Sequence, residues 1–370
     1  MSSSVQTEKI GKLGFGYMRL PRIGGQVDDA QVNKMADAFL ENGGTYFDAA
    51  YVYDGAEVAL GKSVVKRHPR ESYQIATKLP VGMVNKDRPM EHFVETSLER
   101  LGTDYIDFYL LHGISAAASK QAEELGLWEY FAKLKSQGTI RHMGFSFHSH
   151  PKDLDEILTK HPETDFVMCQ LNYDDWDKPK VKAKRLYEIA REHNVPVVAM
   201  EPLFGGKLAS NDSPIAGILK GANPNVSVAS WALRFLAQLE GLFVTLSGMS
   251  TFEQMEDNIK TFADLKRLTN DEMAVIKEAV KALRGVPRIE CTACNYCKDC
   301  PSNIPIPNLI NLYNDHLVHK TMENLHGSYN WLTGGRGKAR DCTKCKACED
   351  ICPQDIEIID TLAKVSGLFD

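Results

Sequence analysis

The chain has 370 residues, which is long enough to bury a large core and to form a large domain with a smaller one beside it. Its apolar fraction of 43%, charged fraction of 25% and net charge of -6 are ordinary for a globular protein and give no reason to expect nucleic-acid binding. Residues 1–9 are too polar for a secretory signal and no apolar run approaches the roughly 20 residues of a membrane span, so we expect a cytoplasmic protein with reduced thiols.

Short apolar, β-branched or aromatic runs alternate along the chain with longer segments of helical period. The runs that we predict as strands are residues 12–18, 45–48, 74–78, 106–112, 142–146, 166–171, 196–200 and 243–247.

The segments between these runs have the spacing of amphipathic helices. Apolar residues recur at helical intervals from Val32 to Leu40, after an acidic start at Asp28 or Asp29 and before Gly43. The segment from Met90 to Leu101 repeats the pattern. Strands separated by helices predict a parallel (β/α)8 barrel, the TIM barrel, which typically takes roughly 250 residues.

An open doubly wound sheet is the alternative fold. Gly11, Gly14 and Gly16 fall before or inside the first predicted strand, so they do not form the glycine fingerprint that follows the first strand of a dinucleotide-binding sheet. The sequence therefore favours the barrel.

Four polar residues, Asp48, Lys78, His112 and Ser146, end predicted strands, and Tyr53 follows the first of them closely. In a barrel, the carboxyl ends of the strands carry the functional residues. A phenol has an unperturbed pKa of about 10, and a neighbouring ammonium lowers it by stabilising the phenolate. Such a group can donate a proton to a carbonyl oxygen while hydride reaches the carbon.

The composition changes near residue 287. Thr269 and Glu272 form a capping-box pattern that opens a helix, which Pro287 ends. The sequence beyond is rich in cysteine, asparagine and proline. We therefore expect a barrel over residues 1–287 and a small, mainly helical second domain over residues 288–370.

Eight of the nine cysteines belong to that second domain, and the ninth, Cys169, is expected to be a small core residue. They form one C-x2-C-x2-C-x2-C run and one C-x2-C-x2-C-x3-C run, each followed by proline. Zinc sites typically use separated C-x2-C pairs, whereas three closely spaced thiolates with a remote fourth suit the corners of an iron–sulfur cubane. The predicted ligands are Cys291, Cys294, Cys297, Cys300, Cys342, Cys345, Cys348 and Cys352.

The residues at the strand ends resemble those of a known family, the aldo-keto reductases. Phe47–Ala50 followed by Tyr53, then Ala76–Lys78, then Leu110–His112, resemble that family's aspartate, tyrosine, lysine and histidine motifs in order and context. The run Gly14–Pro21 is similar to the family's first strand.

The resemblance covers roughly residues 10–285 and implies hydride transfer between a nicotinamide cofactor and a small carbonyl or alcohol substrate. It implies that Tyr53 is the general acid or base, that Lys78 and Asp48 tune it, and that His112 orients the substrate carbonyl.

The same resemblance implies residues that bind NADP or NAD at the barrel mouth. Ser146 and Gln170 match positions that hold the carboxamide, and Pro202–Lys207 resembles the loop near the pyrophosphate. Ser250 and Glu253 suggest a capping box on a helix that could meet an adenosine phosphate. The implied cofactor-binding residues are Ser146, Gln170, Pro202, Leu203, Gly205, Lys207, Ser250, Thr251, Gln254 and Asn258.

Four residues depart from the family pattern. Phe147 stands where asparagine usually follows the serine, and Met200 stands where a tyrosine often stacks on the nicotinamide. Gly248 and Gln254 occupy positions where basic residues commonly hold a 2′-phosphate. The choice between NADP and NAD therefore stays open. The same departures motivate an alternative, in which the barrel is a non-catalytic binding or electron-relay subunit.

The two cysteine runs resemble the two-cluster motif of bacterial ferredoxins, in which the fourth cysteine of each run binds the other cluster. The resemblance implies two 4Fe-4S clusters. Their ligands would be Cys291, Cys294, Cys297 and Cys352 for one, and Cys342, Cys345, Cys348 and Cys300 for the other. Such clusters are either structural or exchange electrons with a ferredoxin or flavoprotein partner, since hydride transfer moves two electrons and a cluster accepts one.

The stretch between the two runs is longer than in a compact ferredoxin. Apolar residues at helical spacing predict a helical insert there, and Gly334–Lys338 is expected to be a turn. His148 and His150 are expected to be solvated loop residues, because no third metal ligand accompanies them. The residues that predict the insert are Leu309, Ile310, Leu312, Tyr313, Leu317, Met322 and Leu325.

Overall fold

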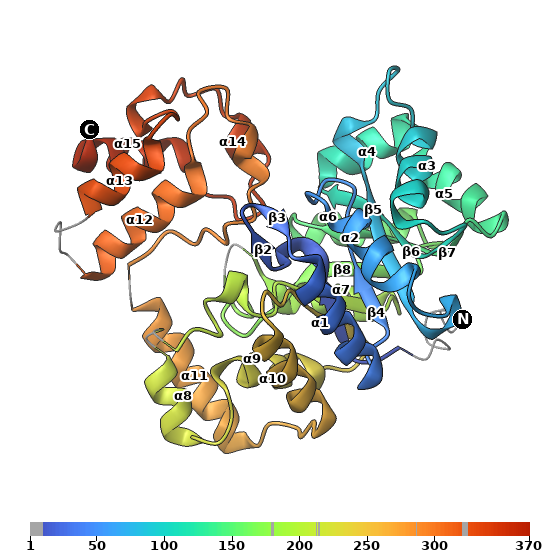
Figure 1. Cartoon of the computed structure of the whole chain (residues 1–370), viewed down its shortest axis with the longest axis horizontal. Helices are drawn as coiled ribbons and strands as arrows, with labels where there is room; N and C mark the ends of the chain where they lie inside the picture. The colour runs from blue at the N-terminus through green and yellow to red at the C-terminus, as the bar shows by residue number, and fades with distance from the viewer. Residues whose placement is uncertain (1–9, 179–180, 212, 214, 286, 320–324) are drawn as a thin grey trace. The chain divides into compact units, whose positions relative to one another are not determined.

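The computed structural model describes residues 10–178, 181–211, 213, 215–285, 287–319 and 325–370. The chain divides into two compact units (Figure 1). The first unit comprises Met1–Leu203 and Lys207–Ile276, and the second comprises Phe204–Gly206 and Lys277–Asp370.

Eight parallel strands close into a barrel in the first unit, in the order β1-β10-β9-β8-β7-β6-β5-β4, with β4 pairing back to β1. The predicted barrel is therefore confirmed, and the open sheet is wrong. Each predicted strand forms, with ends that differ by a few residues. The strands are β1 Leu13–Gly16, β4 Tyr46–Asp48, β5 Gln74–Pro80, β6 Ile106–Ile114, β7 Ile140–Phe147, β8 Phe166–Gln170, β9 Val197–Met200 and β10 Leu242–Ser247.

The helices around the barrel begin and end largely where the sequence places their caps. The Asp28 carboxylate accepts a hydrogen bond from the Gln31 amide at the start of α1, and Gly43 follows the helix with a φ of 79°. The helices of this unit are α1 Asp29–Glu41, α2 Ala56–Leu60, α3 Met90–Leu101, α4 Ala116–Glu124, α5 Leu127–Ser136, α6 Pro151–Lys160, α7 Ala183–Glu192, α8 Ala216–Ala222, α9 Val228–Ala237 and α10 Phe252–Ala263.

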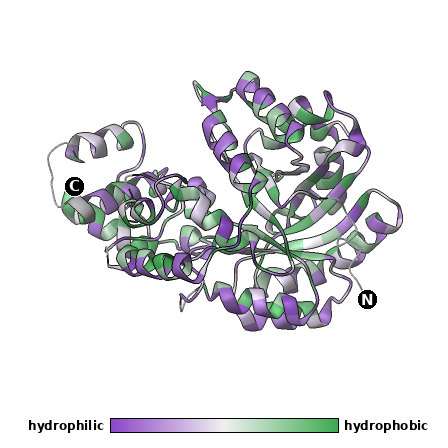
Figure 2. Ribbon diagram, turned by 90° about the horizontal axis from the view of Figure 1, so that it is seen from below, coloured by the Kyte–Doolittle hydropathy of each residue, from purple (hydrophilic) through white to green (hydrophobic). Residues whose placement is uncertain are grey.

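Most of these helices are amphipathic, whereas α9 is buried at all of its residues except Arg234. Figure 2 shows hydrophobic and hydrophilic residues interleaved along the helices. A further helix, α11 Asn270–Arg284, runs from the first unit into the second. Its predicted capping box is present: the Thr269 amide donates to the Glu272 carboxylate over 2.8 Å, and the Glu272 amide donates to the Thr269 hydroxyl over 3.2 Å.

Two local features differ from the sequence-based expectations. A two-stranded hairpin, β2 Arg22–Ile23 with β3 Gln26–Val27, precedes α1 and was not predicted. The capping residue of α10 is Thr251, whose hydroxyl accepts from the Gln254 amide, so the expected Ser250–Glu253 box is wrong by one position. The Gln254 side-chain oxygen accepts a hydrogen bond from the Ser250 amide over 2.8 Å.

The second unit is helical, as expected, with its own apolar core. Leu309 and Leu312 belong to the first of its helices and are buried, which confirms the helical insert; Met322 lies outside the described residues. The helices are α12 Ile306–His319, α13 Leu325–Thr333, α14 Ala347–Asp350 and α15 Ile358–Phe369. Among all described residues, no helix has the length and apolarity that a membrane crossing requires.

Candidate active site and candidate iron–sulfur centres

The side chains inside the barrel show which residues at the strand ends also point inward. Its apolar core contains Tyr46 of β4, Ala76 of β5, Leu110 of β6 and Met168 of β8. Side chains two residues apart on a strand point to the same side. The next inward positions toward the carboxyl ends are therefore Asp48, Lys78, His112 and Gln170. The fold thus brings residues from four separate segments to one end of the barrel.

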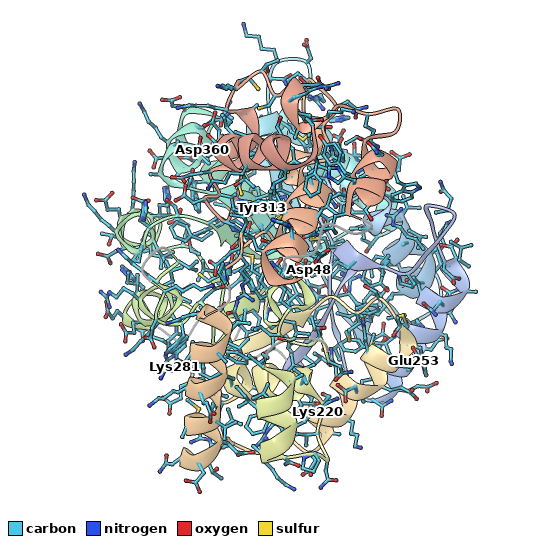
Figure 3. The ribbon with its side chains drawn as sticks, turned by 90° about the vertical axis from the view of Figure 1, so that its left-hand side faces the viewer. Asp48, Lys220, Glu253, Lys281, Tyr313 and Asp360 are labelled. Carbon is cyan, nitrogen blue, oxygen red and sulfur yellow. The ribbon has the colours of Figure 1, made fainter. Side chains whose placement is uncertain are left out.

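Asp48 and Lys78 form an ion pair that is almost completely buried, at 2% and 1% exposure. The Lys78 ammonium donates to the Asp48 carboxylate over 2.6 Å and to the Ala49 carbonyl over 2.7 Å. Burial raises the pKa of Asp48 and lowers the pKa of Lys78, and the pairing opposes both shifts. Figure 3 labels Asp48 among the side chains of the barrel, and labels Lys220 and Glu253 on outer helices.

Tyr53 and His112 lie on the solvent side of this pair. The Lys78 ammonium is 5.0 Å from the centre of the Tyr53 ring, and the Tyr53 and His112 rings meet edge to face with 5.8 Å between centroids. Both rings are half-buried. A turn in which the Tyr53 amide donates to the Ala50 carbonyl holds the phenol just beyond β4. A carbonyl group that reaches this end of the barrel would meet a phenol and an imidazole, with the buried Lys78 ammonium near the phenol.

The sequence suggested that His148 and His150 are both solvated loop residues. His150 is exposed, but the expectation for His148 is wrong. His148 is half-buried, and its backbone N–H donates to the Ile114 carbonyl over 3.2 Å. Burial lowers the pKa of His148 to about 4, with a further contribution from the Lys78 charge. Burial also lowers the pKa of His112 well below its ordinary value, helped by Lys78 and His148. Both imidazoles are therefore neutral at neutral pH.

The two residues expected at the nicotinamide carboxamide are buried at the ends of β7 and β8. The Ser146 hydroxyl accepts a hydrogen bond from the Gly113 amide over 2.9 Å, which leaves its own proton to donate. The Gln170 side-chain amide donates to Asp175 over 2.8 Å. These polar groups at the interior end fit an amide-bearing ring.

A buried carboxylate network behind Gln170 was not predicted. Asp175 accepts from both Gln170 and Asn172, and the Lys178 ammonium pairs with Asp174 over 2.8 Å and with Asp175 over 3.1 Å. The Asp-Asp pair four and three residues before a lysine was the sequence signal for it. The network fixes the orientation of the Gln170 amide.

The residues expected at the adenosine end lie around the start of α10. The Ser250 hydroxyl donates to the Arg19 carbonyl over 2.7 Å, and Gln254 is exposed. Asn258 is 2% exposed, and its amide donates to the Ser247 hydroxyl. The structure therefore gathers these residues at the end of β10, with Asn258 behind the helix start. The Pro202–Lys207 loop follows β9, and Gly205 within it has a φ of 63°.

The departures from the family pattern have different locations. Phe147 points away from the barrel interior by strand alternation; it is 1% exposed and packs against Phe145 with 6.3 Å between ring centroids. Met200 is half-buried at the end of β9, and Gly248 is exposed after β10. Phe147 is therefore accommodated by packing behind the strand.

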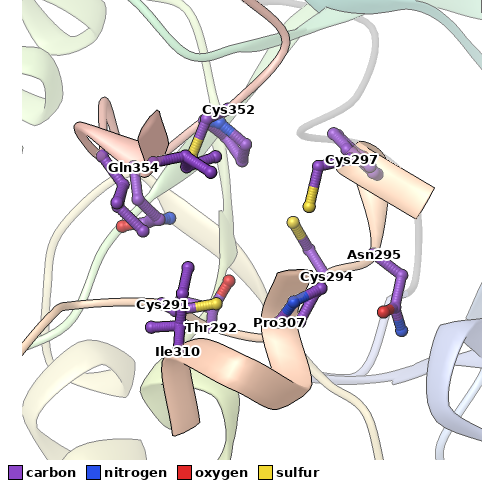
Figure 4. Close-up of a pocket in the computed structure, with 13 residues that line it drawn as sticks. Cys291, Thr292, Cys294, Asn295, Cys297, Pro307, Ile310, Cys352 and Gln354 are labelled. Carbon is purple, nitrogen blue, oxygen red and sulfur yellow. The ribbon is translucent and has the colours of Figure 1, made fainter. Parts of the chain in front are cut away.

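The first candidate cluster centre is a cavity in the second unit. It has an empty volume of about 320 Å³, part of which is open to solvent, and its lining includes four thiols together with Ile310 and Ile356. Figure 4 shows the sulfur atoms around this common space. The thiols are those of Cys291, Cys294, Cys297 and Cys352.

The second candidate centre is a more open cavity of about 690 Å³. Four thiols of the other set line it, and Cys297 also reaches its edge. Cys345 is exposed, whereas its three companions are half-buried. Among the described residues, no three or more histidine, cysteine or acidic side chains stand close enough to hold a single metal ion. The thiols of this set are Cys300, Cys342, Cys345 and Cys348.

The two cysteine runs are local repeats of one backbone shape, which the sequence reading did not identify. In each run the residue before the second cysteine and the residue after it adopt positive φ values: Ala293 at 54° and Asn295 at 63°, Lys344 at 57° and Lys346 at 66°. The same is true three residues after the final cysteine of each run, where C-P-x-[N/D]-I-x-I recurs. Two residues precede the final cysteine in the first run and three precede it in the second, yet the turns of the two runs are equivalent.

The thiols within a set interact with one another. Burial, together with the neighbouring Cys294, Cys291 and Cys352, raises the pKa of Cys297 to about 12. Burial likewise raises the pKa of Cys348 to about 11. A cationic iron centre would offset this repulsion, since only thiolates ligate metals. Each set of four thiols therefore fits an iron–sulfur cluster.

Comparison with known proteins identifies both parts of the chain. Residues 12–281 match the sequence model of the aldo/keto reductase family, and residues 290–357 match that of the 4Fe-4S dicluster domain. An aldo-keto reductase of Mycolicibacterium vanbaalenii is 30% identical over 262 residues, which cover 70% of this chain and 87% of that protein. An uncharacterized oxidoreductase of Bacillus subtilis is 26% identical over 304 residues, covering 74% and 93%.

Solved structures of the same kind share the barrel. An aldo-keto reductase of Bacillus halodurans in its holo form superposes with a TM-score of 0.59 at 25% identity, covering 74% of this chain and 93% of that chain. The fold is also shared with an aldo-keto reductase of Klebsiella pneumoniae in complex with NADPH, at a TM-score of 0.59 and 21% identity over 73% of this chain and 90% of that chain.

Proposed function

The chain belongs to the aldo/keto reductase family and is an oxidoreductase with a 4Fe-4S dicluster domain, and we propose that its barrel catalyses NAD(P)-dependent interconversion of a small carbonyl and its alcohol. The observation that carries the proposal is the buried Lys78–Asp48 pair beneath Tyr53. The family supports this over a non-catalytic module, and a module freed from catalysis has no need of a buried charge pair under an accessible phenol.

The proposed chemistry divides among the four residues. A nicotinamide cofactor, when bound, would supply the hydride for the carbonyl carbon. Tyr53 gives a proton to the carbonyl oxygen. The nearby Lys78 charge stabilises the phenolate that results, and Asp48 keeps that charge in place. Neutral His112 donates a hydrogen bond to the carbonyl oxygen and orients it.

We propose that the cofactor is held by the residues that the family resemblance implies. Ser146 and Gln170 would meet the carboxamide, and Pro202, Leu203, Gly205 and Lys207 would lie near the pyrophosphate. The start of α10 would meet the adenosine phosphate, with Ser250, Thr251, Gln254 and Asn258 around it. Titration of the protein with NADPH and NADH, followed by nicotinamide fluorescence, tests this assignment; binding of neither would contradict it.

The neutral histidines predict the pH dependence of the reaction. A histidine of ordinary pKa would lose its neutral form as the pH falls through about 6.5. Because the folded protein lowers the pKa of His148 to about 4 and that of His112 well below normal, neither ring should gain a proton as the pH falls through 6.5. We expect kcat/KM for carbonyl reduction to change less than about threefold between pH 8 and 5.5. A tenfold fall near pH 6.5 would contradict the assignment.

We propose that the two sets of thiols hold two 4Fe-4S clusters, and that residues 1–287 and 288–370 are the barrel and iron–sulfur domains. Two cavities, one lined by the first set of four thiols and the other by the second set together with Cys297, support the cluster count. Eight ligating thiols suit a reducing compartment, so we place the protein in the cytoplasm. Cell fractionation with an antibody against the chain would test that location.

Cysteine variants should reveal the two sets through iron content. We expect Cys294→Ser and Cys352→Ser to lower bound iron from about eight to about four atoms per chain and to affect the same cluster, because both line the first cavity. Cys345→Ser should remove the other cluster. Cys169→Ser is the matched control, since that thiol is buried in the barrel and should leave iron unchanged. Iron and acid-labile sulfide are measured on protein purified without oxygen.

If Cys352→Ser instead removes the cluster that Cys345 binds, the proposed exchange of fourth ligands between runs is wrong. Iron loss in Cys169→Ser would show that the variants disturb the fold as a whole.

We further propose that the clusters exchange single electrons with a ferredoxin or flavoprotein partner. Cys345 and its neighbours Lys344 and Lys346 are exposed, and Ile351 beside Cys352 is 53% exposed. This surface suits an acidic carrier protein. Anaerobic addition of such a reduced carrier should bleach the cluster absorbance, and an unchanged iron spectrum would contradict the proposal.

A further inference from the structure

The Gln170 side chain at the end of β8 is oriented by an aspartate behind it. Gln170 is 4% exposed and takes the next inward position after Met168 of the barrel core. Its side-chain nitrogen donates to the Asp175 carboxylate over 2.8 Å. An ionised carboxylate only accepts hydrogen bonds, so a glutamine beside it must turn its nitrogen toward it. The Gln170 oxygen, which can only accept, therefore faces away from Asp175.

Asp175 is itself held on both carboxylate oxygens. One oxygen also accepts from the Asn172 side chain over 2.7 Å, and the other lies 3.1 Å from the Lys178 ammonium. The Asp175 amide donates to the Asn172 oxygen over 2.8 Å, and Asn172 also donates to the Glu201 carbonyl after β9 over 3.1 Å. Because Asp175 is 0% exposed, water does not replace these contacts if the carboxylate rotates. The network therefore gives Asp175 a single orientation.

Ser146 on the neighbouring strand has the opposite hydrogen-bonding character. Its hydroxyl oxygen accepts from the Gly113 amide over 2.9 Å, so its proton is available to donate. Strands β7 and β8 pair with Ser146 level with Met168, one inward position before Gln170. A carboxamide has a carbonyl that needs a donor and N–H groups that need an acceptor, and these two side chains offer one of each. A methyl ketone in the same place would leave the Gln170 oxygen without its donor.

Resting on the proposed function, we propose that Asp175 is a positioning residue that makes the site selective for the carboxamide of the nicotinamide ring. Asp175 does not touch the cofactor and acts through Gln170. By accepting from the Gln170 nitrogen, it commits the Gln170 oxygen to an N–H of the carboxamide.

An asparagine at position 175 cannot perform this role. The Gln170 nitrogen and the Lys178 ammonium lie on different oxygens of Asp175, and both require an acceptor. An asparagine side chain accepts at one end and donates at the other, so it satisfies one of the two and opposes the other. Gln170 would then no longer be held with its nitrogen toward position 175, and its oxygen would no longer be committed to the cofactor.

The test measures how strongly the protein prefers a carboxamide. NADP and NAD are each compared with their 3-acetylpyridine analogues, which carry a methyl ketone in place of the amide and so lack its N–H groups. Titration calorimetry on the full chain with its clusters gives the dissociation constants without turnover. We expect the better-bound cofactor to bind at least about tenfold more tightly than its analogue, because the analogue leaves a buried acceptor unpaired. Asp175→Asn should reduce this preference to less than about threefold.

Asp174→Asn is the matched control. Asp174 is also 0% exposed and pairs with the same Lys178 ammonium over 2.8 Å, whereas the Gln170 nitrogen bonds Asp175. Both variants remove a carboxylate beside one buried ammonium, so both should unfold at lower urea concentrations, but only Asp175→Asn should lower the preference. Asp175→Ser serves if Asp175→Asn does not fold. Its hydroxyl donates as readily as it accepts, so it too should bring the preference below about threefold.

A double variant shows whether Asp175 acts through Gln170. Gln170→Met replaces the amide with an apolar side chain of similar length and leaves Asp175 its bond from Asn172. It should lower the preference as Asp175→Asn does. Adding Asp175→Asn to Gln170→Met should change the preference by less than about twofold, since the two substitutions remove one interaction.

Three results would each overturn the inference while the reductase function stands: an unchanged preference in the Asp175 variants, an equal loss in Asp174→Asn, or a further loss in the double variant. A wild-type protein that binds a cofactor and its analogue equally well also overturns it. A protein that binds none of the four compounds contradicts the proposed function itself.

Discussion

Tyr53→Phe is expected to lower the rate of NAD(P)H-dependent carbonyl reduction by about 10²–10⁴-fold, the usual contribution of a general acid. The substitution removes only the phenolic hydroxyl. The ring that meets His112 edge to face and lies 5.0 Å from the Lys78 ammonium is kept. Cofactor binding should therefore be unchanged, and the loss should fall on kcat. Steady-state kinetics and a nicotinamide titration on the same preparation measure the two effects.

Tyr51→Phe is the matched control for this variant. Tyr51 lies two residues earlier in the same segment and is also half-buried, but its hydroxyl is 3.4 Å from His92 and its ring packs on Phe93. Its loss should change the rate by less than about threefold, as for a group outside the chemistry. Equal losses in both variants, or full activity in Tyr53→Phe, would remove Tyr53 from the mechanism.

The barrel could be predicted because its strands are buried on both faces. β8 is buried along its whole length and begins with four consecutive apolar residues, as buried parallel strands often do. β5 is equally buried, although it also contains Gln74, Thr77 and Lys78. Asp48 and Lys78 could be predicted for a related reason: a charged residue that closes an apolar run marks a strand end. That these two residues are partners follows from the parallel pairing of the successive strands β4 and β5, which sets Asp48 level with Ala76.

His148 could not be assigned from the sequence because its position depends on how far the strand pattern continues. Nothing in the residues after Phe147 says whether the backbone stays extended, and the bond to the Ile114 carbonyl that decides this comes from another strand. The hairpin of β2 and β3 was missed for a similar reason, since strands of two residues leave no alternating pattern.

In the cysteine domain, the ligand residues were easier to predict than their arrangement in space. The ligand residues were evident from spacing alone, and only the resemblance to ferredoxins implied which four belong together. In the structure that grouping is determined by chain reversal. Positive φ values at Asn295 and Lys346 curl each loop around its own cavity, while the turns after Cys300 and Cys352 carry those thiols toward the other run. Asparagine tolerates this conformation well, whereas lysine does so at a cost in strain.

Lys78→Met is expected to destabilise the barrel by about 3–5 kcal/mol, the cost of leaving one member of a buried ion pair without its partner. Asp48 is 2% exposed, so water cannot replace the ammonium. The loss should shrink as the pH falls: an unpaired buried carboxyl has a raised pKa in the folded state, the destabilisation is complete above that pKa, and protonation below it removes the buried charge. Urea unfolding at pH 7.5 and pH 5 measures both effects without requiring activity.

Two further variants identify the cause of that loss. Lys62→Met breaks the 2.8 Å pair with Asp29, whose partners are 51% and 49% exposed, and should cost less than about 1 kcal/mol because solvent screens the pair. Adding Asp48→Asn to Lys78→Met should recover part of the stability, because the double variant no longer buries a lone charge. If the double variant is less stable than Lys78→Met, packing rather than charge explains the loss. In that case Asp48 does more for the fold than hold Lys78 under the phenol, and its proposed tuning role would need separate kinetic evidence.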